Sequence, residues 1–220
     1  MCGRFSIATP IEELSERFNV EPPEIDFAPR YNGAPGQDML VITSETPKKM
    51  SLLHWGLVPS WAKDPKIGNR MINARAETVS EKPSFRHAFK QNRCLVLADG
   101  FFEWDKKGKV KTPYYIYLKE HKPFAFAGLY EHWKDEKGKE LNTFTIITTK
   151  ANKLVDKIHD RMPVILQEDK EKEWLNLETK IEDLKMILKP LPARSMEDYQ
   201  ISTLVNNPRN DLPEIILKQR

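Results

Sequence analysis

Sixteen prolines are spread along the 220 residues of this chain, and they limit the length of any helix that it can form. Proline has no backbone N–H to continue a helix or a central strand, so each one favours a break or a turn. The chain contains no internal repeat and no flexible linker that would divide it. We therefore expect many short elements, packed into one domain over residues 1–220.

Six short runs rich in Val, Ile, Leu and aromatic residues have the composition of β-strands. They cover residues 39–43, 51–55, 94–98, 114–118, 124–127 and 142–148. Polar, glycine-containing links at residues 105–108 and 135–138 are typical of hairpin loops. These features predict an α+β fold, with a compact, mostly antiparallel, barrel-like sheet and peripheral helices.

Three segments predict helices around that sheet. Residues 9–12 (Thr-Pro-Ile-Glu) match a capping box with proline at the first helical position, and an apolar stripe follows them. Residues 168–175 and 181–188 have the pattern of surface helices.

Composition excludes several classes of protein. The chain is 40% hydrophobic and 30% charged, which is the balance of a globular protein rather than a disordered or collagen-like one. No run approaches the roughly 18 apolar residues of a membrane helix, and no secretory signal is visible, so we expect a cytoplasmic location and no membrane partner. The net charge of +3 permits a nucleic-acid partner without requiring one.

Metal and cofactor chemistry are not expected. The five histidines have no paired spacing, and the two cysteines lie too far apart in the sequence to suggest a zinc set. The chain also lacks a phosphate-binding glycine loop and a Gly-x-Ser-x-Gly motif.

Cys2 has chemistry that an internal cysteine lacks. Removal of Met1 would leave Cys2 with a free α-amine beside its thiol. An α-amine with a pKa of about 7.7–8.0 is neutral often enough at pH 7 to condense with an aldehyde, and the thiol can then close a thiazolidine ring. A cysteine near a terminus is more often incidental, so the residues that accompany it matter. Cys94, within an apolar run, is expected in the core.

Two segments could supply partners for Cys2. In residues 73–77 (Asn-Ala-Arg-Ala-Glu), Arg75 could hold a phosphate while Asn73 orients a hydroxyl or carbonyl, although a solvated edge strand would look the same. Glu103 stands among three aromatic residues, where desolvation would raise its pKa towards neutrality. The alternative is a strand residue that points into solvent.

His159 and Trp61 are further candidates. His159 lies between a short helical segment and an apolar strand, where Asp160 could orient its ring, but a structural histidine is the more frequent case. The tryptophans of residues 55–61 could stack on unpaired bases, although a pair buried in a β-rich core is more common. Basic residues at 106–111 and 134–139 are diluted by acids or turns and are expected at solvated hairpin tips.

Taken together, five motifs resemble the SRAP family of SOS response-associated peptidases, or abasic-site-processing proteins. They are residues 1–5 (MCGRF), 55–61 (WGLVPSW), 73–77 (NARAE), 100–104 (GFFEW) and 159–163 (HDRMP), in that order. Residues 205–210 (VNNPRN) also fit, so the resemblance covers nearly the whole chain.

The resemblance implies a β-rich domain that binds single-stranded DNA and captures abasic sites covalently, in a lyase-type reaction that shields them from strand cleavage. It also implies that the protein removes its own Met1. The expected catalytic residues are Cys2 as nucleophile, Asn73 and His159 as hydrogen-bonding groups for the abasic nucleotide, and Glu103 as proton shuttle. The expected DNA contacts are Arg4, Arg75, Arg161 and Trp61. We expect a monomer, associated with the nucleoid if the source is bacterial.

Two other functions also fit the residues. In an N-terminal-nucleophile amidohydrolase or peptidase, the thiol would attack a carbonyl, with the α-amine as base and an oxyanion hole nearby. In a non-catalytic binder of single-stranded DNA, arginines and tryptophans alone would hold the strand.

Overall fold

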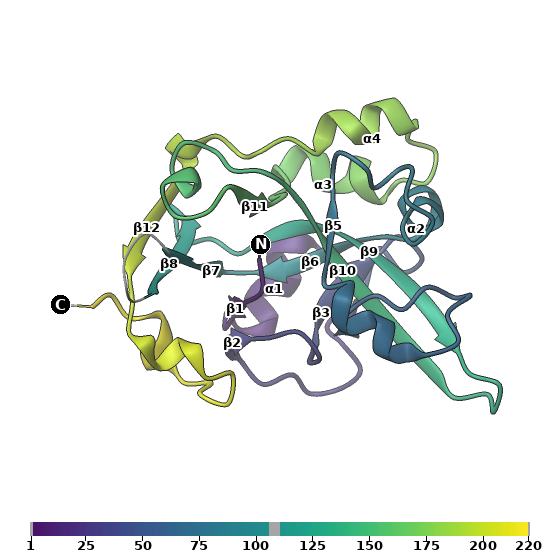
Figure 1. Cartoon of the computed structure of the whole chain (residues 1–220), viewed down its shortest axis with the longest axis horizontal. Coiled ribbons are helices and arrows are strands. Elements are labelled where there is room, and N and C mark those ends of the chain that lie inside the picture. Colours follow the sequence, from purple (N-terminus) through teal and green to yellow (C-terminus); the bar gives the residue numbers. More distant parts are fainter. Residues whose placement is uncertain (1, 106–110, 220) are drawn as a thin grey trace.

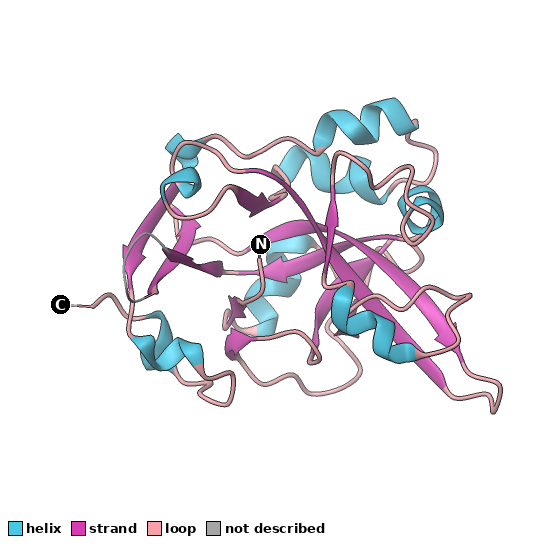
Figure 2. Ribbon diagram, in the orientation of Figure 1, coloured by secondary structure: helices cyan, strands magenta, loops and turns pink. Residues whose placement is uncertain are grey.

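The structure is a computed structural model that describes residues 2–105 and 111–219. Figures 1 and 2 show its strands gathered in the middle of the molecule, with helices at the periphery. The strands are β1 Phe5–Ile7, β2 Arg30–Gly33, β3 Asp38–Thr43, β4 Met50–Trp55, β5 Asn73–Arg75, β6 Arg93–Ala98, β7 Gly100–Asp105, β8 Thr112–Leu118, β9 Phe124–Lys134, β10 Glu140–Lys150, β11 Arg161–Pro163 and β12 Met196–Gln200. The α-helices are α1 Ile11–Phe18, α2 Arg86–Gln91, α3 Glu168–Leu175 and α4 Ile181–Ile187. The 3-10 helices are η1 Pro65–Arg70, η2 Val155–Lys157, η3 Ala193–Ser195, η4 Thr203–Asn206 and η5 Pro213–Ile216.

Five strands form a closed barrel. The pairs run β10–β4, β4–β3, β3–β6 and β6–β9, and β9 pairs back with β10 to complete the circle. All of these pairs are antiparallel except β10–β4, which is parallel. Closure leaves no unpaired edge within the circle, because every barrel strand has a neighbour on both sides. The expectation of a mostly antiparallel, barrel-like sheet is confirmed.

Strand β10 continues beyond the barrel and collects two more short strands. Its residues 146–148 pair in parallel with β5, and its residues 148–150 pair antiparallel with β11. Strands β5, β10 and β11, which come from distant parts of the sequence, therefore lie side by side at residues 146–150 of β10 (Figure 1).

A second sheet, in the order β12-β8-β7-β1-β2, is antiparallel throughout. Strand β1 in this sheet packs against the barrel, because the ring of Phe5 lies 5.0 Å from Trp55 and 5.7 Å from Phe126. Such aromatic pairs contribute about 0.5–1.5 kcal/mol beyond the area that they bury. The chain immediately before β1, which includes Cys2, is thereby held in the interior.

The expected elements are largely confirmed. All six predicted strands are present, although β9 and β10 extend further than the apolar runs. Helix α3 covers the predicted residues 168–175, α4 ends one residue early, and residues 135–138 join β9 to β10 as a hairpin. Part of the other predicted hairpin link, residues 106–108, and most of the basic run 106–111 lie outside the described residues.

The prediction of a capping box at residues 9–12 is wrong. Pro10 occupies the N-cap of α1, and no side chain caps the helix. The Thr9 hydroxyl instead donates to Asp99 Oδ1 over 2.7 Å, and Asp99 Oδ2 also accepts the Ala8 and Thr9 backbone N–H groups. The partly buried carboxylate of Asp99 thus engages Thr9 in place of the local cap.

The described residues contain neither a membrane-spanning helix nor a cluster of side chains that could hold a metal ion. None of the helices combines the length and the apolar character that crossing a bilayer requires. Nowhere in residues 2–105 and 111–219 do three or more His, Cys, Asp or Glu side chains come together in a group that could hold a metal ion.

Candidate active site

The thiol of Cys2 is fully buried in the main hydrophobic core. Its Sγ lies 3.9 Å from the backbone carbonyl oxygen of Arg4. Burial raises the pKa of this thiol well above its usual range, and the negative charge of Glu103 raises the pKa further. Cys2 is therefore a protonated thiol at neutral pH, in electrostatic contact with the carboxylate that the sequence analysis singled out.

Asn73, the first residue of β5, holds the backbone of Cys2. Its Nδ2 donates a hydrogen bond to the carbonyl oxygen of Cys2 over 2.8 Å. Its Oδ1 is buried, and within the described part of the chain it accepts no hydrogen bond. Leaving a buried polar atom unsatisfied costs about 1–3 kcal/mol, so this oxygen is a candidate to receive a donor from a ligand.

Glu103 lies on β7, and only 3% of its surface is exposed. Strand β7 pairs with β1, and the N–H of Phe102 donates to the carbonyl oxygen of Arg4 over 3.0 Å. This backbone contact ties the segment of Glu103 to the segment of Cys2. The interpretation of Glu103 as a desolvated carboxylate, rather than a solvent-facing strand residue, is confirmed. Its raised pKa stays a prediction.

His159 lies in the turn between η2 and β11, and 14% of its side chain is exposed. Its Nδ1 accepts a hydrogen bond from the backbone N–H of Arg161 over 3.0 Å. A neutral ring must then carry its proton on Nε2, which makes that nitrogen a donor. Asp160 Oδ1 lies 3.0 Å from the same Nδ1, so a doubly protonated ring can pair with this carboxylate instead.

An open depression of about 680 Å³ adjoins His159. Arg75 lines the depression from the end of β5, whose first residue, Asn73, contacts Cys2. The lining residues are Arg75, Lys150, Ala151, Asn152, Lys153, Asp156, His159, Asp160 and Arg161. Sequence reasoning missed Lys150 and Lys153, because exposed lysines after a strand carry no distinctive pattern.

Two of the expected DNA-binding arginines, Arg161 and Arg75, differ in whether their side chains already have partners. Arg161 forms a two-pronged ion pair with Glu77, at 2.6 and 3.0 Å, and also donates to the carbonyl oxygen of Thr148. Arg75 is exposed, and its side chain forms no hydrogen bond or ion pair with the residues that the structure describes. Of these two, only Arg75 can bind an incoming anion without first breaking an ion pair.

Arg4 ties the C-terminal segment to the site. Its Nη1 donates to Asn32 Oδ1 and to the carbonyl oxygen of Val205, each over 2.7 Å. Trp104, next to Glu103, donates from Nε1 to Asn206 Oδ1 over 2.7 Å. Residues 205–206 are therefore bound to the N-terminal segment that contains Cys2 and to β7, which carries Glu103. The sequence analysis did not identify Asn32, which has no local motif.

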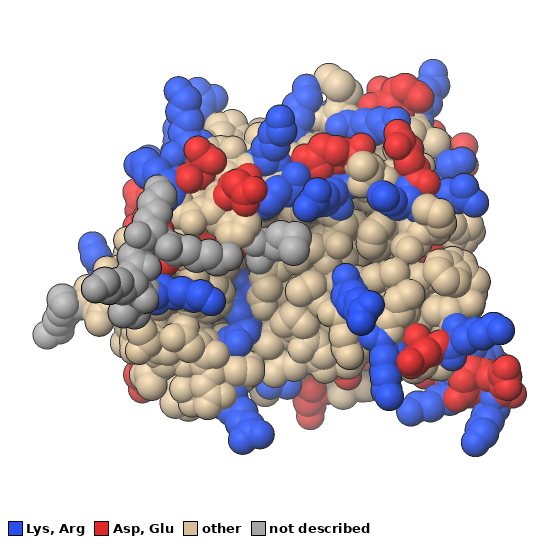
Figure 3. Space-filling view, in the orientation of Figure 1, with Lys and Arg blue, Asp and Glu red and all other residues tan. Residues whose placement is uncertain are grey.

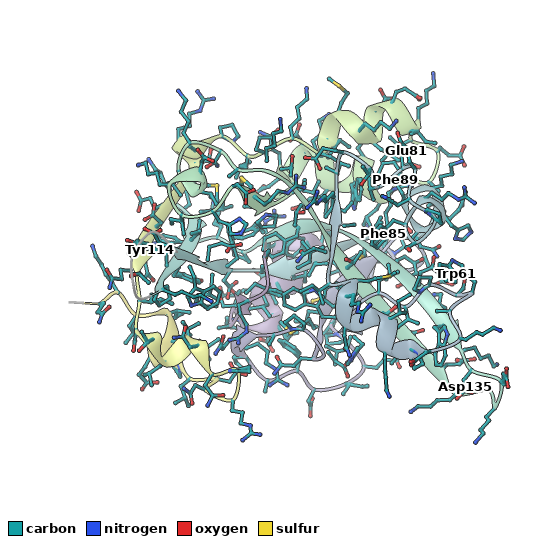
Figure 4. The ribbon with its side chains drawn as sticks, in the orientation of Figure 1. Trp61, Glu81, Phe85, Phe89, Tyr114 and Asp135 are labelled. Carbon is teal, nitrogen blue, oxygen red and sulfur yellow. The ribbon has the colours of Figure 1, made fainter. Side chains whose placement is uncertain are left out.

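The two tryptophans of residues 55–61 lie in different environments. Trp55 is buried in the core, whereas Trp61 is 60% exposed. Figure 4 shows Trp61 towards the end of the molecule that carries the β9–β10 hairpin, away from the N-terminus marked in Figure 1. Gly56 lets the loop leave β4, because its φ of +138° and its contact with Gly68 leave no room for a side chain.

Comparisons with known proteins agree over the whole length of the chain. The model of a family described as SOS response associated peptidase (SRAP) matches residues 1–208. Abasic site processing protein YoqW of Bacillus subtilis (strain 168) is 50% identical over 221 residues, covering 98% of this chain and 99% of that protein. Abasic site processing protein HMCES of Xenopus tropicalis is 33% identical over 231 residues, covering 88% of this chain and 68% of that protein. A crystal structure of a protein from Bacteroides thetaiotaomicron matches with a TM-score of 0.92 and 32% identity, covering 100% of both chains.

Proposed function

Because this chain belongs to the SOS response associated peptidase family, we propose that it processes abasic sites in DNA through a covalent bond to Cys2. The names of its relatives support the substrate. The observation that carries the chemistry is the gathering of Asn73 and Glu103 around a cysteine at position two.

The reaction joins the ring-opened deoxyribose to both reactive groups of Cys2. After Met1 has gone, the α-amine attacks the C1′ aldehyde, and loss of one water gives an imine. The sulfur then adds to the imine carbon, and the proton of the thiol moves to the nitrogen. The product is a thiazolidine, and the sequence consumes no oxidant or reductant. Closing this ring removes the imine, which would otherwise promote β-elimination of the 3′ phosphate.

The residues around Cys2 have separate roles in these steps. Glu103 accepts and returns protons during ring opening and during addition of the thiol, a contribution typically worth about 10²–10⁴-fold in rate. A thiol kept protonated by burial needs such a base at the moment when its sulfur attacks. Asn73 orients Cys2 and offers Oδ1 to the amine or the sugar. His159 donates from Nε2 to the abasic nucleotide.

Release of Met1 is part of the proposal. Hydrolysis of the Met1–Cys2 peptide bond consumes one water and frees the α-amine that the imine requires. The Cys2 thiol is the nucleophile for this cleavage in the chain itself, consistent with the peptidase activity in the family's name.

One denaturing gel tests the function. Purified protein is incubated with single-stranded DNA that holds one abasic site, and the mixture is then heated in detergent. We expect a shifted band that disappears in Cys2→Ala and persists in the matched variant Cys94→Ala, because Cys94 is an internal core cysteine whose backbone nitrogen is an amide and cannot form the imine. Intact mass should show loss of Met1 from the form that crosslinks.

Two results would contradict the proposal, and each would favour a different function. A shift seen only in native gels would indicate a non-catalytic binder of single strands. Cleavage of peptides without any response to abasic DNA would indicate an amidohydrolase.

A further inference from the structure

The far end of β10 gathers cations from three strands. Thr148 on β10 lies opposite Arg75 on β5, and Lys150 lies opposite Arg161 on β11. The chain then turns, and Lys153 joins these residues in the lining of the same depression. Figure 3 shows Lys and Arg side chains, interspersed with Asp and Glu, along the upper part of the molecule, above a largely uncharged area of the face.

These cations differ in whether they already have partners. Arg161 is committed to Glu77 and Thr148. Lys150 and Lys153 are exposed, and like Arg75 they form no ion pair with any residue in the described ranges 2–105 and 111–219. Three cations without a close ion-pair partner, around one open depression, favour an anionic ligand.

Two carboxylates of the lining offset part of this positive charge. Asp160 lies against the ring of His159, at 3.0 Å from Nδ1. Asp156 is the other carboxylate in the lining. The Lys and Arg side chains of the depression outnumber these carboxylates, so its net charge is positive.

We propose that Lys150 and Lys153, together with Arg75, bind consecutive phosphates of the DNA strand on one side of the captured sugar. This inference rests on the proposed function, since the strand must enter the depression from the site of Cys2. Residues 148 and 150 are separated by about 7 Å along an extended strand, so Arg75 and Lys150 present their charges to different phosphates. The ligand class is a single-stranded polyphosphate backbone, read without contact to bases.

The salt dependence of DNA binding tests this inference. For single strands, each phosphate contact contributes a slope of about 0.7 in log K against log salt. The double variant Lys150→Ala/Lys153→Ala should therefore flatten the slope by about 1.4 and weaken binding about tenfold at low salt. The matched control is Lys137→Ala, in the β9–β10 hairpin at the opposite end of β10, which should leave the slope unchanged.

Neutralising single phosphates locates the contact. Oligonucleotides carry one methylphosphonate at successive positions on either side of the abasic site. At the contacted positions, neutralisation should weaken binding of the wild-type protein but not weaken the double variant further. If the penalties of the substitution and of the methylphosphonate add at every position, the proposal is wrong.

Asp156→Asn should change DNA affinity in the opposite direction to the double lysine variant. Removing this negative charge should tighten DNA binding by about twofold, the size of an exposed charge interaction. These binding experiments use the wild-type slope as their reference and need no crosslink. A wild-type protein that binds with the expected slope but never crosslinks would overturn the proposed chemistry and leave the phosphate contacts standing. A slope identical in wild type and double variant would overturn the phosphate contacts alone.

Discussion

The side-chain amide of Asn73 donates to the backbone carbonyl oxygen of Cys2 over 2.8 Å, across a sequence separation of 71 residues. Because a carbonyl oxygen can only accept, the amide nitrogen must face Cys2 and the amide oxygen must face away. One side chain therefore both fixes the second residue of the chain and presents a buried acceptor. This relationship makes Asn73 a positioning residue for Cys2.

Asn73→Asp should slow crosslinking by about tenfold, because it replaces a hydrogen bond worth about 1–1.5 kcal/mol by two oxygens that both accept. The rate is measured as the appearance of the denaturation-resistant band under saturating DNA. Asn142→Ala removes an asparagine that bonds to His132 on the outer part of the barrel, and it should leave the rate unchanged. Equal rates for Asn73→Asp and the wild-type protein would refute the role.

Glu103→Gln should have two effects of opposite direction. The carboxylate raises the pKa of the Cys2 thiol, so the neutral amide should lower that pKa. Crosslinking should nevertheless slow by about 10²-fold or more, because the proton shuttle is lost. The change in pKa is followed by the rate of thiol alkylation at one fixed pH in a Cys94→Ala background, because a lower pKa increases the thiolate fraction. A variant that lowers the pKa and crosslinks faster would show that Glu103 only tunes the thiol.

Protein stability should fall at alkaline pH. Burial raises the pKa of the thiols of Cys2 and Cys94 in the folded state. Such groups contribute stability that is fully present below the unfolded pKa of about 8.5 and is lost as pH rises towards the folded pKa. Each group should cost about 1.4 kcal/mol per pH unit in that window. Urea unfolding across this range measures the slope, and Cys94→Ala should remove half of the cysteine contribution.

Arg75→Ala and Arg161→Lys should separate phosphate binding from structural pairing. Arg75→Ala should flatten the salt dependence of DNA binding by about 0.7, one phosphate on a single strand. Arg161→Lys loses the two-pronged contact with Glu77, so its main expected effect is a decrease of about 1 kcal/mol in the free energy of unfolding. If Arg161→Lys flattened the salt slope as much as Arg75→Ala, Arg161 would have to exchange Glu77 for a phosphate when DNA binds.

Much of the fold follows from local pattern. Short apolar runs between prolines and glycine-containing links predicted the strands, because alternation and β-branched composition are properties of neighbouring residues. The chemistry available to Cys2, Glu103 and His159 could also be inferred from the sequence, because it depends on the residue types themselves. The failed cap at Thr9 marks the limit of this reasoning. Thr9 accepts no N–H of the helix and instead donates its hydroxyl to Asp99, 90 residues away.

The amino-acid order alone established which side chains could react and which stretches would be strands. Tertiary packing was required to bring these side chains together. Asn73 reaches Cys2 because β5 pairs with β10, and Arg4 reaches Val205 across 201 residues. Lys150 and Arg75 line one depression because β10, which ends at Lys150, pairs with β5. Such contacts arise when burial of the barrel and of β1 fixes distant segments together. Local sequence encodes propensity and charge, whereas distance between remote residues is a property of the whole folded chain.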